Sequence, residues 1–354
     1  MTKTLMAGKK IKTLSELGEF ELIRKLTDDI ILRHPGSRKG IGDDSAVIDH
    51  NGFLTLVTTD LLLEGIHFDL TYVPLKHLGY KSVIVNLSDI YAMNGIPLQI
   101  TVSIGISSKL SLGAIEEFYK GIKLACNQYD IDLIGGDTSA SLNGLTISVT
   151  ALGTAQSQQI VYRKGAKTGD LICVTGDLGG AYMGLLLLER ENRFFKADHG
   201  YKPQLDGYQY ILERQLKPEA RKDLGRTLMG NQVKPTAMID ISDGLSSELM
   251  HICEASGTGS RIFADRIPIH PETKKLAGHL LISPVVAALN GGEDYEILFT
   301  ISPEDYSRVQ AMEGITVIGI MTEKTEGHLM ELADKSTIIM EAQGWNANQR
   351  WAGL

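Results

Sequence analysis

Aspartates flanked by small residues recur along the chain, and side chains of this kind can bind a metal ion or act on phosphate. The stretch GIGDDSAVID places Asp43 and Asp44 between glycines and an apolar run. Similar aspartates are Asp60 in TTD, Asp89 in NLSD, Asp137 in GGDTS, and Asp240 and Asp243 in DISDG. Most of them follow an apolar run, which is where a strand or helix ends and a loop carries chemistry.

If the chain gathers these carboxylates in one place, their charges must be compensated. Like charges about 4 Å apart cost on the order of 4 kcal/mol at an effective dielectric constant of about 20. Oxygen ligands with Ser and Thr hydroxyls nearby suit Mg²⁺, which keeps several waters and is usually shared with substrate phosphates. Zinc would require clusters of His or Cys, which this sequence does not show. The sequence therefore predicts magnesium.

Local structure explains some of these aspartates without a metal. In GIGDD, an aspartate can stabilise a tight turn by bonding its own backbone. Ser242 or Asp243 would serve as the N-cap of the helix that follows DISDG. Capping does not explain Asp89, which sits inside a helical apolar pattern, or Asp60, which ends a β-branched strand.

The common nucleotide-binding motifs are missing from the sequence. It has no GxxxxGK[ST] P-loop, no complete GxGxxG and no HRD/DFG pair. Glycine-rich segments at 135–137, 176–180 and 290–294 could bring backbone N–H groups near phosphates, especially where Gly179 and Gly180 precede a helix. Taken alone, each segment is more typical of a tight turn than of a phosphate site.

Hydrophobic periodicity predicts the elements that must position these residues. In the first half, strands are predicted at 53–60, 98–106, 132–141 and 145–155, and helices at 75–95 and 112–130. After a polar segment, strands are predicted at 171–177, 236–244 and 294–301, and helices at 180–191, 221–231 and 245–257. Two α/β domains of similar size, 1–156 and 157–354, are the simplest interpretation.

Composition excludes several classes of protein. The 354 residues include 35 Lys and Arg against 43 Asp and Glu, so the net charge of −8 offers no basic surface for nucleic acid. Cys126, Cys173 and Cys253 lie far apart and show no CxxC spacing, which argues against a disulfide framework. The N-terminal segment has no apolar signal region, and no apolar run has the ~20 residues of a membrane span. We expect a cytoplasmic protein.

The motifs taken in order resemble one family. They are GIGDDSAV, TTDLLLEGIHF, KSVIVNLSDIYAMNGIP, LIGGDTS, RKGAKTGD, VTGDLGGA, IDISDGLSSEL and NGGEDYEILFT. From about residue 16 to 346 the chain resembles the thiamine-monophosphate kinases, whose superfamily includes aminoimidazole ribonucleotide synthetase, selenophosphate synthetase and a hydrogenase-maturation protein. The resemblance implies in-line transfer of the ATP γ-phosphoryl group to thiamine monophosphate, giving thiamine diphosphate. It also implies an α/β (α+β) fold, with an N-terminal sheet that pairs into a barrel across a homodimer and a C-terminal α/β domain over ATP.

The resemblance implies a role for each matching residue. The metal ligands would be Asp44, Thr58, Thr59, Asp60, Asp89, Asp137, Asp240 and Asp243, of which Asp60, Asp89, Asp137 and Asp240 would be catalytic. The ATP contacts would be Tyr119, Gly136, Asp137, Arg163 and Ser242. The thiamine phosphate contacts would be His67, Glu293 and Trp345. Asp43 fits the ligand position less well than Asp44 does, and the tail GWNANQRWAGL departs from the family pattern, so Trp351 is an alternative to Trp345.

Such a reaction needs no covalent intermediate, because phosphoryl transfer depends mostly on positioning and electrostatic stabilisation. The attacking phosphate oxygen is already largely ionised near neutral pH. Two alternatives remain: another ATP-dependent synthetase of the superfamily, or a non-catalytic module that binds metal and nucleotide. Selenophosphate synthetase would show a reactive Cys or Sec near its N-terminus and the hydrogenase-maturation protein a C-terminal Cys, but the cysteines here lie between 126 and 253. Retention of all six aspartates argues against the non-catalytic module.

Overall fold

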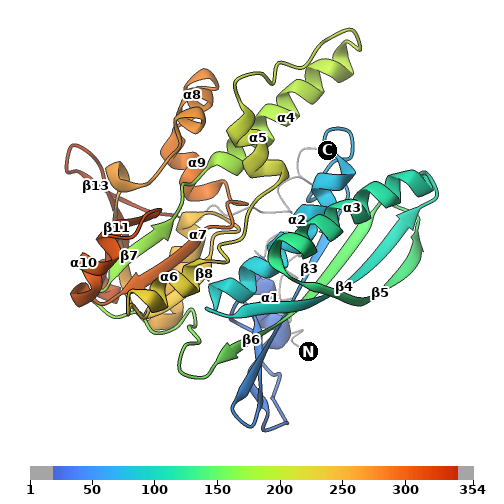
Figure 1. Cartoon of the computed structure of the whole chain (residues 1–354). Helices are drawn as coiled ribbons and strands as arrows, with labels where there is room; N and C mark the ends of the chain where they lie inside the picture. Colours follow the sequence, from blue (N-terminus) through green and yellow to red (C-terminus); the bar gives the residue numbers. More distant parts are fainter. Residues whose placement is uncertain (1–18, 342–354) are drawn as a thin grey trace, which may run out of the picture. The chain divides into compact units, whose positions relative to one another are not determined.

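A computed structural model describes residues 19–341, with side chains from residue 22, and it contains two β-sheets built from different parts of the chain (Figure 1). Both sheets belong to one compact unit, residues 34–345. Helix α1 (Glu19–Thr27) belongs to a different unit. No helix within the described residues is both long and apolar enough to cross a membrane. The cytoplasmic location stays a prediction.

The first sheet has six strands in the order β1-β2-β3-β6-β4-β5. The strands are β1 (Ser37–Lys39), β2 (Ala46–His50), β3 (Phe53–Leu63), β4 (Ile96–Ser107), β5 (Asp132–Ser141) and β6 (Thr146–Gln156). All neighbouring pairs are antiparallel except β4 and β5, which run parallel. The sheet stays open in the single chain, because β1 and β5 are its edges.

Two helices cover one face of this sheet. Along β6, buried residues alternate with half-buried ones, as expected for a strand with one covered face. Helices α2 (Leu75–Ala92) and α3 (Leu112–Tyr129) pack on that face and complete its apolar core. The two helices approach closely at Gly121, where an added Cβ would lie 1.9 Å from the carbonyl oxygen of Lys76. Because Gly121 has no side chain, α3 can pack this closely against α2.

Strand β5 is an edge strand with unusual exposure. Every residue of β5 except the last is exposed, including Leu133 at 39% and Ile134 at 60%. Its one strand neighbour is β4, through a parallel ladder that runs from Gln99 to Ser107. An exposed edge with apolar side chains favours pairing with another chain.

The second sheet has seven strands in the order β13-β12-β9-β11-β7-β10-β8. They are β7 (Leu171–Thr175), β8 (Ala237–Asp240), β9 (Gly259–Phe263), β10 (Ile297–Ile301), β11 (Ile315–Thr322), β12 (His328–Glu331) and β13 (Thr337–Ile339). The α-helices of this part are α4 (Gly180–Ala197), α5 (Gln209–Leu216), α6 (Leu224–Gly230), α7 (Leu245–Ser256), α8 (Pro271–His279), α9 (Pro284–Asn290) and α10 (Tyr306–Gln310).

Apolar residues line both faces of this second sheet. Ile172 and Val174 of β7 belong to a core that includes α7, whereas Cys173 between them belongs to a core that includes α6. Successive side chains of a strand point to opposite faces, so α7 and α6 cover opposite sides. Central strands buried on both faces read as continuous apolar runs, which is why LICVT and EILFTI were recognisable in the sequence.

Most predicted elements are present, with shifted ends. The strands predicted at 98–106, 132–141 and 145–155 correspond to β4, β5 and β6. The last strand of the first sheet, β6, ends at Gln156. The prediction at 53–60 was too short, since β3 continues to Leu63. The elements that were not predicted are strands β1, β2, β9, β11, β12 and β13 and helices α1, α5, α8, α9 and α10. Division into two domains at 156 stays a prediction, and the three cysteines are buried free thiols.

Candidate active site

Three aspartates from distant parts of the chain meet at one point. Asp44 precedes β2, Asp89 lies in the last turn of α2, and Asp240 ends β8. Each offers a carboxylate oxygen, and the three oxygens lie within 4.8 Å of one another. Asp44 and Asp240 are buried and Asp89 is half-buried. The structure thus brings three of the predicted metal ligands together, and we call them the Asp cluster. Their role as metal ligands stays a prediction.

Donors from three segments hold these carboxylates. The guanidinium of Arg163 donates to Oδ1 of Asp44 from Nε at 3.1 Å and from Nη2 at 2.7 Å. Ser88 Oγ donates to Asp240 Oδ2 at 2.7 Å, and Thr58 Oγ1 donates to Asp89 Oδ2. Oδ2 of Asp44 is buried and makes no hydrogen bond.

Burial raises the pKa of each carboxyl in the Asp cluster. It raises that of Asp44 to about 7, where Arg163 opposes the shift and Asp240 adds to it. Burial raises the pKa of Asp240 to about 6. The pKa of Asp89 lies well above its ordinary value, first through burial and then through the charge of Asp60 and Asp240. Burial therefore disfavours the charged forms of these carboxyls, and a bound cation would favour them.

The donor set fits Mg²⁺. All groups of the Asp cluster are hard oxygens, and the unbonded Oδ2 of Asp44 leaves a ligand atom available. Asp60 is close enough to raise the pKa values of Asp89 and Asp240, and Asp243 also raises that of Asp240. The charges of five predicted metal ligands therefore affect one another, namely those of Asp44, Asp60, Asp89, Asp240 and Asp243.

Folding raises the pKa values of the carboxyls in the Asp cluster, so we expect the metal-free protein to lose stability as the pH rises. Protonation also competes with metal binding, so the metal should stabilise the protein more at higher pH. A carboxyl whose pKa is raised on folding stabilises the native state below its unfolded pKa, and this stabilisation is lost as the pH passes its folded pKa. For Asp44 that window runs from 3.8 to about 7. Thermal unfolding in EDTA should show a lower Tm at about pH 8 than at about pH 5.5, and the gain in Tm from Mg²⁺ should be larger at the higher pH. A Mg²⁺ effect that is larger at low pH would contradict this.

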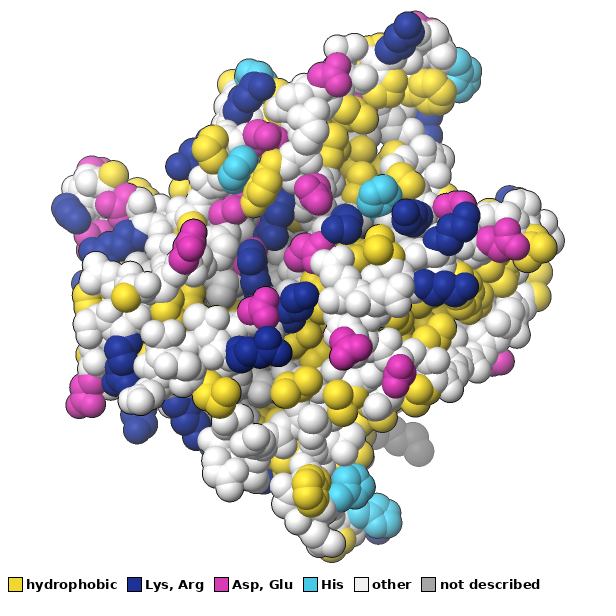
Figure 2. Space-filling view, in the orientation of Figure 1, with side chains coloured by type: hydrophobic (Ala, Val, Ile, Leu, Met, Phe, Trp, Pro, Cys, Tyr) yellow, Lys and Arg dark blue, Asp and Glu magenta, His cyan; other side chains and the backbone are white. Residues whose placement is uncertain are grey.

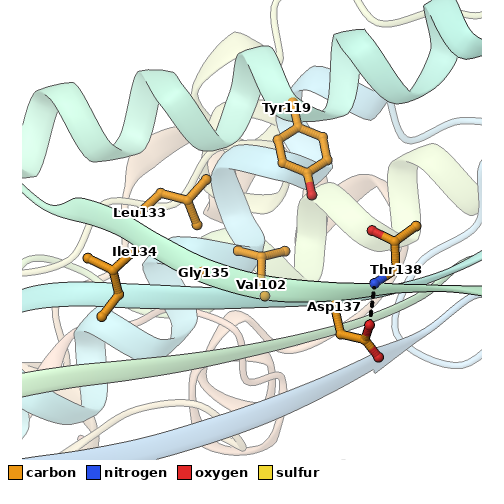
Figure 3. A pocket seen from close by; sticks show the side chains of 8 residues that line it. Val102, Tyr119, Leu133, Ile134, Gly135, Asp137 and Thr138 are labelled. Carbon is orange, nitrogen blue, oxygen red and sulfur yellow. Dashed lines mark hydrogen bonds between the residues drawn. The ribbon is translucent and has the colours of Figure 1, made fainter.

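Three predicted ATP contacts line one pocket. Tyr119 of α3 lies over β5, and Gly136 and Asp137 line the same cavity of about 490 Å³. Figure 3 shows the Tyr119 hydroxyl directed toward the strand and the Asp137 carboxylate accepting from the backbone N–H of Thr138, at 2.9 Å. The other two predicted ATP contacts, Arg163 and Ser242, lie outside this lining.

The structure corrects two positions. Asp60 was expected where a strand ends, but it lies inside β3, which continues to Leu63. Asp137 lies inside β5, in agreement with the strand predicted at 132–141. The side chain of Thr59 points to the opposite face of β3 from Thr58 and Asp60, because alternate residues of a strand face opposite ways. There its hydroxyl donates to the carbonyl oxygen of Val149 at 3.1 Å. The Thr59 hydroxyl is therefore not among the groups that surround the Asp cluster.

The N-cap prediction for DISDG was wrong. Helix α7 begins after Gly244, and neither Ser242 nor Asp243 is its N-cap. Instead, Glu248 reaches back from the first turn of α7 and accepts from the backbone N–H groups of Ser242 and Asp243 at 3.0 and 2.6 Å. Burial and the charge of Asp243 raise the pKa of Glu248 to about 8. Glu248 orders the loop that carries Asp243, and an acidic residue in the first turn was the signal that could have found it.

The predicted anion site at the start of α4 is filled by the protein itself. The backbone N–H of Gly179 donates to Oδ2 of Asp294 at 2.8 Å. Asp294 is fully buried and lies 3.6 Å from the guanidinium of Arg214. In this structure the turn therefore binds a side-chain carboxylate of its own chain.

Glu293, a predicted substrate contact, lies in a second polar group next to the Asp cluster. Its carboxylate accepts from Lys81 of α2, from Gln215 of α5 at 3.1 Å, and from the hydroxyl of Tyr295 at 3.3 Å. Burial, and then the charges of Glu293, Asp60 and Asp240, raise the pKa of Tyr295. Tyr295 therefore lies close to both groups of carboxylates.

The remaining predicted residues have simpler surroundings. His67 lies in the turn after β3, and its Nδ1 accepts from the backbone N–H of Leu63 at 3.0 Å. Asp43 accepts from the backbone N–H of Arg163 at 3.1 Å and lies 3.5 Å from Lys39. Trp345 and its alternative Trp351 lie outside the described residues. On the face that Figure 2 shows, Lys and Arg side chains are interspersed with Asp and Glu.

The fold and the N-terminal half of the sequence are similar to those of known proteins. Residues 42–155 match the family described as AIR synthase related protein, N-terminal domain. The structure of "Crystal structure of HypE-HypF complex" has the same fold, with a TM-score of 0.69 and 16% identity over 91% of this chain and 99% of that chain. Residues 42–155 are thus similar to the AIR synthase related proteins, and the chain as a whole shares the fold of the matched structure.

Relatives over the full length narrow this class. Thiamine-monophosphate kinase of Bacillus subtilis (strain 168) is 35% identical over 339 residues, which is 93% of this chain and 99% of that protein. The protein of the same name from Aquifex aeolicus (strain VF5) is 35% identical over 88% of this chain and 97% of its own. The structure "AaThiL complexed with AMPPCP and TMP" matches with a TM-score of 0.80 and 32% identity over 96% of this chain and 99% of that chain. The chain belongs to the thiamine-monophosphate kinase family.

Proposed function

We propose that the chain transfers the γ-phosphoryl group of ATP to thiamine monophosphate and releases thiamine diphosphate and ADP. The observation that carries this proposal is the Asp cluster, formed by Asp44, Asp89 and Asp240. The relatives' shared name and the structure with AMPPCP and TMP support the choice of both substrates.

Mg²⁺ is the proposed cofactor, with several ions bound. The Asp cluster with Asp60 and Asp243 would hold metal at one place, and Asp137, on β5, would bind it at the pocket beside that strand. When bound, it neutralises charge that develops on the transferred phosphoryl group. Hydrogen bonds within the chain orient the carboxylates that would bind the metal: Ser88 donates to Asp240, and Thr58 donates to Asp89. Arg163 balances part of the negative charge through its two bonds to Asp44.

We propose that the nucleotide occupies the cavity beside β5. Tyr119 offers an aromatic ring and a hydroxyl there, and the bare backbone at Gly136 allows close approach of a ligand. Arg163 and Ser242 would contact the phosphate end, since they lie beside the Asp cluster and its loop. The acceptor phosphate of thiamine monophosphate is largely ionised near neutral pH, so no strong general base is needed.

The exposed edge at β5 supports a two-fold homodimer in which the first sheets of two chains form a barrel. Pairing would cover Leu133, Ile134 and the unpaired backbone of this edge. We expect light scattering at micromolar protein concentration to give twice the chain mass of 38.7 kDa. A mass of one chain at that concentration would contradict the dimer.

An assay of ADP release tests the proposed function most directly. Purified protein with ATP and Mg²⁺ should release ADP when thiamine monophosphate is added, and excess EDTA should abolish this release until Mg²⁺ is restored. Release with an aminoimidazole precursor instead would identify another synthetase of the superfamily. Nucleotide binding with no ADP release for any acceptor would indicate a non-catalytic module.

A further inference from the structure

Lys81 is a buried cation that the reaction as described does not use. It lies on α2, and its side chain is 9% exposed. Lysine is seldom buried unless its ammonium group is paired. Here Nζ donates to Oε2 of Glu293 and to the carbonyl oxygen of Gln215, the latter at 3.1 Å. The pair joins residues 212 positions apart in sequence.

The backbone of Glu293 is held as firmly as its side chain. Glu293 and Tyr295 have positive φ values of 60° and 51°, which non-glycine residues adopt at an energetic cost. The backbone N–H of Glu293 donates to the carbonyl oxygen of Ser242 at 2.7 Å, and that of Tyr295 to Ile241 at 2.9 Å. The loop is thus fixed to the segment that follows Asp240, and Glu293 keeps a set distance from the Asp cluster.

The two oxygens of the Glu293 carboxylate are not equivalent. Oε2 accepts from Lys81 and from Gln215 Nε2, so both of its lone pairs are used. Oε1 accepts one long bond of 3.3 Å, from the hydroxyl of Tyr295. The Glu293 side chain remains 28% exposed. A ligand can therefore reach the carboxylate, and Oε1 has acceptor capacity left for it.

We propose that Lys81 is a positioning residue of the acceptor pocket: with Gln215 it fixes Oε2 of Glu293, so that Oε1 receives an N–H or cationic group of the phosphate acceptor. This inference rests on the proposed function, because thiamine monophosphate carries both a cationic thiazolium ring and amino hydrogens. A carboxylate fixed on one oxygen loses little freedom on binding, which favours affinity. Without Lys81, Glu293 can rotate away from the pocket.

The test compares Lys81→Met with a matched control, Lys335→Met, which breaks an exposed Lys–Glu pair with Glu331. We expect Lys81→Met to raise the KM for thiamine monophosphate about ten-fold or more, with the KM for ATP changed less than about two-fold. Lys81→Arg keeps the charge and should restore part of the loss. Lys335→Met should leave both constants unchanged.

A double-mutant cycle with Glu293→Gln separates positioning from general support of the fold. If Lys81 acts through Glu293, Lys81→Met should add little to the KM of Glu293→Gln. Additive effects, or equal rises in the KM values for both substrates, would overturn the inference. If Lys81→Met fails to fold, Gln215→Met removes the other donor to Oε2 and should raise the same KM. Failure of the unmodified protein to phosphorylate thiamine monophosphate would instead refute the proposed function, and calorimetric titration with that compound would then show whether Lys81 still affects binding.

Discussion

Asp89→Asn should lower kcat by about a thousand-fold or more while the protein remains folded. Asp89 contributes one of the three oxygens of the Asp cluster, and an amide at this position removes a charged ligand for the metal. A thousand-fold loss corresponds to about 4 kcal/mol of transition-state stabilisation, which is reasonable for a mispositioned bridging ion. Steady-state kinetics with saturating ATP, thiamine monophosphate and Mg²⁺ would measure it.

The stability of the same variant provides a second readout. Burial and the charges of Asp60 and Asp240 oppose ionisation of Asp89, so removing its charge relieves repulsion in the metal-free state. We therefore expect the Tm of Asp89→Asn in EDTA to equal or exceed that of the unmodified protein. Asp206→Asn, at an exposed position, serves as the control and should change neither value. Turnover at the normal rate in Asp89→Asn would remove this residue from the reaction.

Gly136→Ala should greatly reduce use of ATP, because no side chain fits at this point of β5. An added Cβ would lie 1.9 Å from the carbonyl oxygen of Val102 and 2.7 Å from its carbon, both in the backbone of the neighbouring strand β4. Backbone cannot yield as a flexible side chain does, so β5 must shift and carry Asp137 with it. We expect the KM for ATP to rise at least about ten-fold, together with a fall in kcat.

The neighbouring glycine supplies a matched control for this prediction. A Cβ on Gly135 would meet the methyl group of Thr101 at 3.9 Å, which is an ordinary contact. Gly135→Ala leaves β5 in place and adds only a methyl group to the lining of the cavity, so its effect on the KM for ATP and on kcat should be much smaller than that of Gly136→Ala. Circular dichroism should show that both variants retain their helices. Equal kinetic effects of the two substitutions would show that the close approach at Gly136 is not the cause.

The residue types and their local patterns predicted the centre of the site but not its supports. Asp44, Asp89 and Asp240 could be found because a carboxylate among small residues at the end of an apolar run is unusual in each local window. Ser88 could not be found in this way, since its partner Asp240 is 152 positions away and a serine inside a helix carries no local signal. Contacts of that kind depend on how β8 and α2 pack, which sequence periodicity does not encode.

The same difference applies to the fold: elements with a clear local pattern were predicted, and elements that depend on distant partners were not. The alternating pattern of β6 and the long helix α2 were visible, because one covered face imposes a period on the sequence. Strand β9 was missed because GSRIF is short and contains few apolar residues, and its pairing partners β11 and β12 lie far along the chain. The end of β3 was misjudged because polar Thr58 and Asp60 face α2, where the rest of the strand buries leucines.

Helix α2 also sets the spacing between the two sites that are proposed to bind the ends of the acceptor. It carries Lys81 near its start and Asp89 near its end, eight residues further along one uninterrupted helix. At a rise of 1.5 Å per residue, their backbones are separated by about 12 Å along the helix axis. If the acceptor binds Glu293 and the Asp cluster as proposed, the distance between its ring system and its phosphate must match the spacing of these two sites along the helix. An acceptor lengthened by one methylene between its ring and its phosphate would keep every recognised group and still be rejected, because its phosphate would overshoot the point of transfer.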